Sequence, residues 1–253
     1  MAIKIFNQNI GNPFIELQAV ESTNNYAMQQ LQNNMATHGA CFFAHTQTAG
    51  KGQRLKQWIS EAGQNITLSV LLDTTGLSVS QLFEISVVVA VAAYDFFNSY
   101  ALHSTYIKWP NDIYWCDRKA GGILIENIIR GNKWQFGVAG IGLNINQTNF
   151  PPQLLNPVSL KQITGKNFDV IVMAKELCNY IQSRYTQLLQ NGFKDLLHYY
   201  NAALYKKNET VKLKKEQTVF FCIVKEVNEY GQLITEGASK ESFEFGEVEW
   251  LIG

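Results

Sequence analysis

The sequence lacks the features that mark several large classes of protein. Basic and acidic residues are equal in number, 21 of each, so no excess charge attracts the chain to nucleic acid or to an anionic membrane. The first eight residues have neither the charged start nor the apolar run of a secretory signal. The longest apolar stretch, residues 85–97, is interrupted by polar side chains and is too short to span a bilayer. We therefore expect a compact, soluble protein of the cytoplasm.

Cysteine is scarce, and its spacing does not suit metal binding. The four cysteines are far apart and form no Cys-x-x-Cys pair. They lie in apolar or strand-like segments, which is typical of reduced and mostly buried thiols. We expect neither a zinc site nor a disulfide framework from Cys41, Cys116, Cys178 and Cys222.

Hydrophobic patterns predict an α+β protein with two domains. Strands are expected at 14–20, 39–47, 65–72, 105–107, 121–126 and 134–146, and helices from Ser22 and over 78–100, 169–189 and 193–204. From residue 206 the pattern changes to short strands with turn signals, at 210–213, 219–224, 230–234 and 245–250. We therefore expect a main domain over residues 1–205 and a small β-barrel over residues 206–253.

The most distinctive stretch is Lys108-Trp109-Pro110-Asn111-Asp112. A short strand leads into it, Pro110 ends that strand, and Asn111 and Asp112 stand where a turn is expected. A lysine, an amide and a carboxylate therefore share one turn, and Lys119 follows shortly after. Such a turn is either a solvated corner or a surface that faces a polar substrate.

Three other segments each allow two interpretations. Ser22 suits a helix N-cap, while Ser22-Thr23-Asn24 together would suit the floor of a ligand pocket. Residues 48–58 carry glycines and cations, which fits a surface loop or a loop that approaches a phosphate. The glycines of residues 134–146 fit a softened hairpin strand or the close approach of a ligand.

In order and spacing, these segments together resemble the catalytic domain of biotin protein ligases. The matching motifs are Ser22-Thr23-Asn24, Gln47-x-x-Gly50-Lys51-Gly52 up to Trp58, Lys108-Trp109-Pro110-Asn111-Asp112, Lys119-x-x-Gly122-Ile123-Leu124-x-Glu126 and Gly140-x-Gly142-x-Asn144. The resemblance covers residues 14–146 by motif. It implies a mixed β-sheet flanked by helices, as in class II aminoacyl-tRNA synthetases, with a C-terminal SH3-like barrel.

The resemblance also implies a two-step, ATP-dependent reaction. The biotin carboxylate would attack the α-phosphate of ATP to give biotinyl-5′-AMP and pyrophosphate, with Mg²⁺ accompanying the triphosphate. A lysine of a biotin carboxyl carrier domain would then displace AMP. Both steps need fixed cations and amide donors more than a protein nucleophile, so the lack of a Ser-His-Asp or Cys-His arrangement is no objection.

Individual roles follow from the same resemblance. Biotin would be bound by Ser22, Thr23, Asn24, Gln47, Gly50, Lys51, Gly52, Gln53, Lys119, Gly122 and Gly140. ATP would be bound by Trp58, Lys108, Asn111, Leu143 and Asn144. The catalytic cations would be Lys119, Lys108 and Lys51. Asp112 would contact either a metal ion or the acceptor lysine.

The glycine loop, residues 48–58, departs from the arginine-rich pattern of the family. Lys51 and Gln53 stand where arginines are common, and Leu55 stands where a glycine is common. Lysine keeps a point charge without the bidentate fork of arginine, and Gln53 removes a charge. We therefore expect looser retention of the adenylate by a loop that is mobile without ligand and closes over it.

Some family members carry an N-terminal helix-turn-helix domain and repress transcription. The strand expected at Phe14 leaves no room before it for such a domain, so we expect a monofunctional ligase that does not bind DNA. The family's habit of pairing through sheet edges implies a homodimer.

Two alternative functions stay open. A lipoate or octanoate ligase or transferase would share the fold, but its Arg-Arg-x-x-Gly-Gly-Gly segment is absent. A non-catalytic biotin-binding or nucleotide-binding regulator would be expected to lose Lys119 or the loop cation, and both are present.

Overall fold

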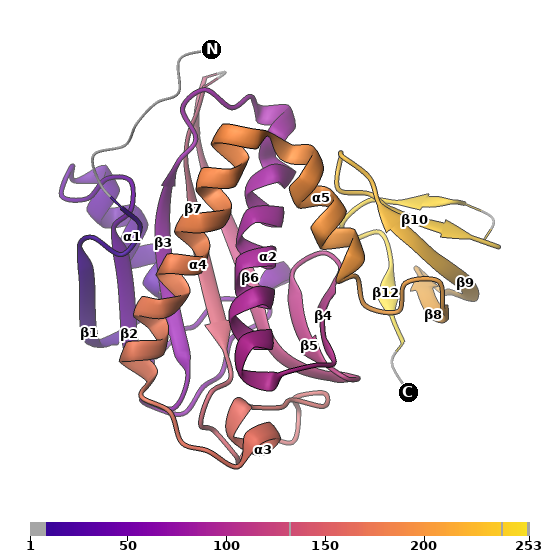
Figure 1. Ribbon diagram of the computed structural model, residues 1–253, viewed down its shortest axis with the longest axis horizontal. Helices are drawn as coiled ribbons and strands as arrows, with labels where there is room; N and C mark the ends of the chain where they lie inside the picture. The colour runs from indigo at the N-terminus through magenta and orange to yellow at the C-terminus, as the bar shows by residue number, and fades with distance from the viewer. Residues whose placement is uncertain (1–8, 132, 239, 252–253) are drawn as a thin grey trace.

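The main body of the protein is a seven-stranded mixed sheet with helices on both faces (Figure 1). The computed structural model describes residues 9–131, 133–238 and 240–251. The sheet has the order β1-β2-β3-β7-β6-β5-β4, with only β1 and β2 parallel. Its strands are β1 (Phe14–Val20), β2 (Cys41–Gln47), β3 (Ile66–Asp73), β4 (Thr105–Lys108), β5 (Asp112–Trp115), β6 (Arg118–Arg130) and β7 (Lys133–Leu143).

The helices divide between the two faces of this sheet. On one face α2 packs against α4 and α5, and all three helices lie in front of the sheet in Figure 1. On the other face α1 packs against β2, β3 and β7. The helical segments are α1 (Thr23–Gln32), α2 (Leu82–Ala101), α3 (Leu160–Thr164), α4 (Val170–Asn191) and α5 (Phe193–Ala202), with short 3₁₀ turns at Gln53–Leu55 and Val79–Gln81.

Helix α2 is the central helix of the core. With its leading turn it extends over Val79–Ala101, long and apolar enough to cross a membrane by length and composition alone. The prediction that no apolar segment reaches this length is therefore wrong. The helix is nevertheless a core element here, because most of its apolar side chains are buried against the sheet and against α4.

Side chains along the central strands alternate between the two faces of the sheet, and this alternation explains where a site can form. On β3, Val70 and Leu72 join the main core, whereas Leu71 packs with Ala27 of α1 on the opposite face. Helix α1 covers only part of that second face. Next to Leu71 on the same face come Ser69 and Thr67, so polar positions of β3 lie beside the N-terminal end of α1.

A second, five-stranded antiparallel sheet follows α5 and lies at one end of the molecule (Figure 1). Its order is β11-β10-β9-β8-β12, with β8 (Thr210–Lys215), β9 (Thr218–Val227), β10 (Leu233–Glu236), β11 (Ser242–Phe243) and β12 (Glu249–Trp250). A single strand over 245–250 was expected, and this is wrong. The Glu247 carboxylate accepts a bond from Glu244 N and, with Gly246 at φ +90°, makes a turn before β12.

The cysteines are mostly buried, as predicted. Cys41, Cys178 and Cys222 are buried, and burial raises the pKa of the Cys41 thiol, whose Sγ lies 3.6 Å from that of Cys178. Cys116 is exposed, because it occupies a tight turn between β5 and β6 with φ +50°.

Candidate functional site

A cavity of about 800 Å³ opens between the α1 face of the main sheet, the glycine loop and the second sheet. It brings together most residues that the sequence indicated: Ser22, Thr23, Asn24, Gln47, Lys51, Gly52, Gln53, Trp58, Lys108, Asn111, Asp112, Lys119, Gly122, Gly140 and Asn144. Gly50 and Leu143 do not line it. Leu143 is fully buried in the main core, and Gly50 packs beneath the loop, where a side chain would strike Trp58 O.

The floor of the cavity is a hydrogen-bonded group at the start of α1. Ser22 caps the helix by accepting a bond from Asn25 N, as its position predicts. Thr23 donates from both its backbone N and its Oγ1 to Gln47 Oε1, over 2.8 and 3.1 Å. Ser69 Oγ lies 2.7 Å from Thr23 Oγ1 and ties this group to β3. The floor is therefore fixed before any ligand arrives.

Asn24 is held by the protein itself. Its Nδ2 donates to Glu126 Oε2 over 2.8 Å and to Leu124 O over 3.3 Å, and its Oδ1 accepts from Ser69 Oγ over 2.6 Å. The amide lies directly on Gly140, where a Cβ would come within 2.5 Å of Asn24 Oδ1. Asn24 thus braces α1 against β6 and β7, and Gly140 is the glycine that makes room for this brace.

Glu126 holds the floor of the cavity, although its place in the sequence predicts no specific role for it. Its other carboxylate oxygen, Oε1, lies 3.3 Å from Lys51 Nζ, so one carboxylate joins the floor to the glycine loop. The signal was present, because Glu126 ends the Lys119-x-x-Gly-Ile-Leu-x-Glu motif.

Lys119 is paired with a carboxylate inside the cavity. Its Nζ lies 2.7 Å from Asp112 Oδ1 on the neighbouring strand. Gly122 leaves space for the pair, since a Cβ there would lie 3.2 Å from Asp112 Oδ1 and 3.4 Å from Lys119 Nζ. Lys119 thus has a carboxylate partner that lines the cavity, and Lys51, which also lines it, is paired with Glu126. An anionic ligand would have to replace those partners.

The turn that carries Lys108 is tied to its surroundings on two sides. Asn111 Nδ2 donates to Ile123 O, and Ile123 N donates back to Asn111 O over 3.0 Å. Trp109 Nε1 donates to Gly231 O, in the turn between β9 and β10 of the second sheet, over 2.9 Å. The Lys108 ammonium lies over aromatic rings, and burial lowers its pKa to about 8. The turn from Lys108 to Asp112 is therefore held firmly in place, and it forms part of the cavity wall.

The glycine loop closes on itself through its backbone. Gly52 N donates to Lys56 O over 2.7 Å, and Trp58 N donates to Gly50 O over 2.9 Å. The Trp58 ring covers Gly142 of β7, where a Cβ would come within 2.4 Å of its Cε2. The glycines of this loop and of β7 therefore permit close packing that any side chain would prevent.

Asn144 follows directly after β7 and holds that segment in place. Its Nδ2 donates to Val158 O over 3.1 Å and to Lys119 O over 3.4 Å, and the side chain is buried. Asn144 thereby fixes the segment after β7 against the start of β6, next to Lys119.

The structure offers little for a metal ion held by protein alone. Among the described residues, no three His, Cys, Asp or Glu side chains come together as a metal site. The Asp112 carboxylate, the candidate ligand, is already engaged by Lys119. These residues do not fit a resident metal.

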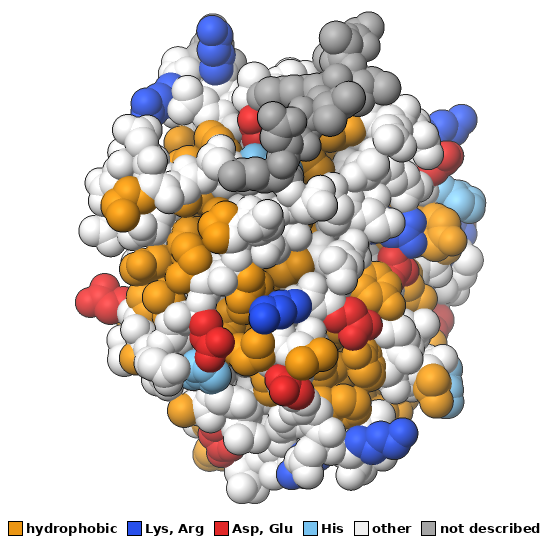
Figure 2. Space-filling view, turned by 60° about the vertical axis from the view of Figure 1, so that its left-hand side comes forward, with side chains coloured by type: hydrophobic (Ala, Val, Ile, Leu, Met, Phe, Trp, Pro, Cys, Tyr) orange, Lys and Arg blue, Asp and Glu red, His pale blue; other side chains and the backbone are white. Residues whose placement is uncertain are grey.

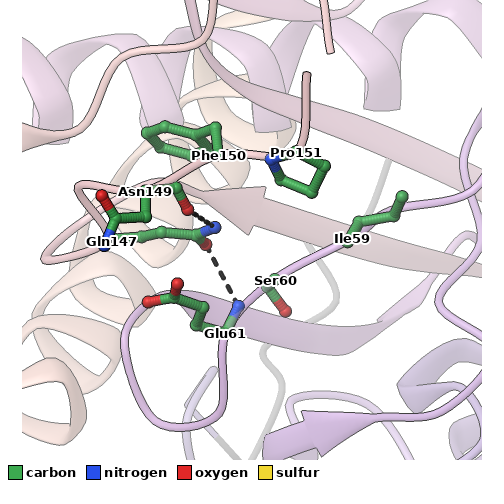
Figure 3. A pocket seen from close by; sticks show the side chains of 7 residues that line it. All are labelled: Ile59, Ser60, Glu61, Gln147, Asn149, Phe150 and Pro151. Carbon is green, nitrogen blue, oxygen red and sulfur yellow. Dashed lines mark hydrogen bonds between the residues drawn. The ribbon is translucent and has the colours of Figure 1, made fainter. Parts of the chain in front are cut away.

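A smaller hollow of about 310 Å³ lies beside the main cavity and shares Ile59 with it (Figure 3). Its central polar group, the Gln147 amide, is used within the protein: Oε1 accepts from Glu61 N over 3.1 Å and Nε2 donates to Asn149 O over 2.8 Å. The central amide of the hollow is therefore already engaged, and the larger cavity is the candidate site.

The chain is similar to a known family of proteins. Residues 16–144 match the model of the biotin/lipoate A/B protein ligase family. The chain is 30% identical over 187 residues to the bifunctional ligase/repressor BirA of Bacillus spizizenii, covering 73% of this chain and 57% of that protein. It is 34% identical over 137 residues to the biotin–[acetyl-CoA-carboxylase] ligase of Paracoccus denitrificans, covering 51% of this chain and 56% of that protein. The chain thus spans little more than half the length of these relatives.

A solved structure has the same fold. The biotin protein ligase of Aquifex aeolicus, determined with biotin and ATP, superposes with a TM-score of 0.79 at 23% identity, covering 95% of this chain and 99% of that one. The expected mixed sheet flanked by helices is confirmed. Because the family model matches just over half of the sequence and includes most of the motifs that line the cavity, the chain belongs to the biotin/lipoate A/B protein ligase family.

Proposed function

We propose that this protein activates biotin with ATP and transfers it to a lysine of an acceptor protein. The observation that carries the proposal is the cavity itself. It places a polar floor next to Lys51 and Lys119, with Lys108 on the adjoining wall. The names of the relatives, which include biotin ligases, support the same activity.

The proposed first step joins two anions, so its main requirement is fixed positive charge. Thr23, Gln47 and their neighbours would bind the ureido head of biotin, which directs its carboxylate toward Lys119. A carboxylate oxygen then forms a bond to the α-phosphorus while the bond to pyrophosphate breaks. Lys119 and Lys108 would stabilise the charge that develops on the phosphate oxygens.

The second step transfers the acyl group. The amine of the acceptor lysine forms a bond to the biotinyl carbon, the bond to AMP breaks, and the amine loses a proton. When the adenylate occupies Lys119, the Asp112 carboxylate loses its partner. Asp112 would then be free to bind the acceptor ammonium or to help accept its proton.

The nucleotide would occupy the other end of the cavity. Trp58 and Asn144 would lie beside the adenine together with Asn111, and Leu143 would contribute through its backbone only, because its side chain is buried in the core. Magnesium enters this proposal as the companion of the triphosphate substrate, since the described residues do not form a metal site of their own.

We infer further that residues 206–253 form a separate domain whose sheet closes as an SH3-like barrel, and that the acceptor is a biotin carboxyl carrier domain. The balanced charge supports a cytoplasmic protein that does not bind nucleic acid. Strand β1 is an edge strand, and hydrophobic side chains gather around single charged ones on that side of the molecule (Figure 2). This supports pairing of two copies through that edge.

The test is pyrophosphate exchange into ATP, measured with biotin and with lipoate as the acid substrate. We expect exchange with biotin only, followed by transfer of labelled biotin to a purified carrier domain. Exchange with lipoate alone would replace the proposal with a lipoate ligase. Biotin binding without any exchange would show a regulator.

A further inference from the structure

The second sheet forms one wall of the cavity, although its residues lie more than a hundred positions from the glycine loop and from the Lys108 turn. Its contribution comes from the turn before β12, from β12 itself and from the residue after it. The cavity is lined there by Phe245, Gly246, Val248, Glu249, Trp250 and Leu251.

Lys108 lies against two aromatic rings that come from different sheets. Its Nζ is 5.2 Å from the ring centre of Tyr114 on β5 and 5.3 Å from that of Trp250 on β12. Both distances fall within the roughly 6 Å over which a ring face attracts a cation. Tyr205 packs against both rings, at 5.1 and 5.9 Å between centroids, and so fixes them relative to one another.

The charges around Lys108 leave its ammonium without a neutralising partner. Asp112 and Glu249 attract it from β5 and β12, while Lys119 and Lys56 repel it. Among the residues described by the structure, no carboxylate makes an ion pair with Lys108, and Asp112 is paired with Lys119 instead. Ring faces therefore hold this cation, and they do so without cancelling the charge that an anion would seek. Lys51 and Lys119 differ, because each has a carboxylate partner.

A tryptophan at position 250 lowers the stability of the fold, and the contact of its ring face with Lys108 helps to explain why it is there. Its indole Nε1 is buried without a hydrogen-bond partner in the described part of the chain. A buried, unpaired N–H destabilises a fold, and a phenylalanine or leucine would avoid that loss. The indole is also the strongest cation-binding ring among the side chains.

We propose that Trp250 is a positioning residue which, with Tyr114, holds the Lys108 ammonium in the cavity, uncompensated and ready to bind a phosphate of the nucleotide. The proposal rests on the proposed function, because that function supplies the nucleotide. It gives the second sheet a direct part in nucleotide binding.

The experiment compares W250L, which keeps apolar bulk without a ring, with W250F, which keeps a ring face. In biotin-dependent pyrophosphate exchange, W250L should raise KM for ATP roughly five- to thirty-fold, and kcat should fall as well, because Lys108 also stabilises the charge that develops on the phosphate oxygens. W250F should restore most of the affinity. The matched control is F221L, which removes another ring under a lysine, Lys212 at 5.9 Å, at an exposed position of β9 outside the cavity.

A second measurement does not depend on activity. Acetylation of individual lysines with an N-hydroxysuccinimide ester, read by peptide mass mapping, reports how well each amine is covered. Labelling of Lys108 should increase in W250L and stay low in W250F, with thermal unfolding measured to show that each variant is folded.

The proposal is overturned if folded W250L keeps the KM of the starting protein, if W250L and W250F raise KM equally, or if Lys108 labelling is the same in all variants. If the unaltered protein shows no biotin-dependent exchange, the proposed function fails. The labelling result then still decides whether Trp250 holds Lys108.

Discussion

The two ends of the cavity are built on different physical principles. At the α1 end, Thr23, Asn24 and Ser69 are buried and hydrogen-bonded to one another or to neighbouring strands. At the opposite end, the cations of Lys108 and Arg54 lie over rings of the second sheet, with Arg54 5.5 Å from the Phe245 ring. Directional hydrogen bonds fix a geometry, whereas ring faces hold a charge and allow it to shift. We therefore expect a rigid floor for the acid substrate and an adaptable wall for the nucleotide.

The largest effect should come from adding a methyl group at Gly140, which packs against Asn24 in the floor of the cavity. In G140A the new Cβ would come within 2.5 Å of Asn24 Oδ1, so the brace between α1 and β6 must move. We expect a loss of about 1–3 kcal/mol in the free energy of unfolding and weaker biotin binding by at least ten-fold. Urea unfolding and calorimetric titration with biotin measure both. G137A on the same strand is the control, since its Cβ would make only ordinary contacts of 3.6 Å or more.

A smaller and more selective effect is expected at the nucleotide end. In G142A the Cβ would come within 2.4 Å of the Trp58 ring, which must tilt away from β7. Since Trp58 belongs to the loop and not to the floor, KM for ATP should rise about ten-fold while biotin affinity changes little. Equal losses for both substrates, relative to G137A, would mean that the two ends are not independent.

The affinity for ATP at the wall of the cavity should also depend on pH. Burial lowers the pKa of Lys108 to about 8, so its ammonium is charged below that pH and becomes neutral as the pH rises through it. KM for ATP should therefore increase between pH 7 and 9.5, while the affinity for biotin at the floor stays flatter. K108R, whose guanidinium stays charged, should remove this rise. A rise of the same size in K108R would assign the pH dependence to another group.

The smallest effect is expected where the two ends meet. E126Q keeps an oxygen that can accept the Asn24 N–H and removes the charge that pairs with Lys51 at 3.3 Å. The pair is partly exposed, so it is worth about 1 kcal/mol or less. Without this competitor, Lys51 should add its attraction to that of Lys119 for the biotin carboxylate, so biotin should bind about two- to five-fold more tightly in calorimetry. Weaker binding would instead show that Glu126 chiefly braces the floor.

The sequence predicted the floor and the central turn better than the wall. Short motifs such as Ser22-Thr23-Asn24 and Lys108 to Asp112 keep their chemistry within a few residues, and the structure brings them to one cavity. Trp250 and Phe245 carried no such signal, because their contacts depend on how the second sheet packs against the first. The roles of Ser69 and Glu126 could not be predicted for the same reason, because both residues act through hydrogen bonds to α1, which is distant in the sequence.

The expected strand boundaries failed for a related reason. Phe245, Val248 and Trp250 are residue types common in strands and predict a strand over 245–250, but Glu247 pairs with Lys215 and Lys240, and the chain turns there. These partners fix Glu247 as a carboxylate, and they lower its pKa to about 2. Local patterns do not reveal such tertiary contacts.

The central claim is that Lys119 holds the acid carboxylate and then the acyl phosphate, and replacement of this lysine tests it most directly. K119M should abolish biotin-dependent pyrophosphate exchange while the urea midpoint stays close to that of the unaltered protein, because the Lys119–Asp112 pair is partly exposed. Exchange by folded K119M at the rate of the unaltered protein would contradict the account.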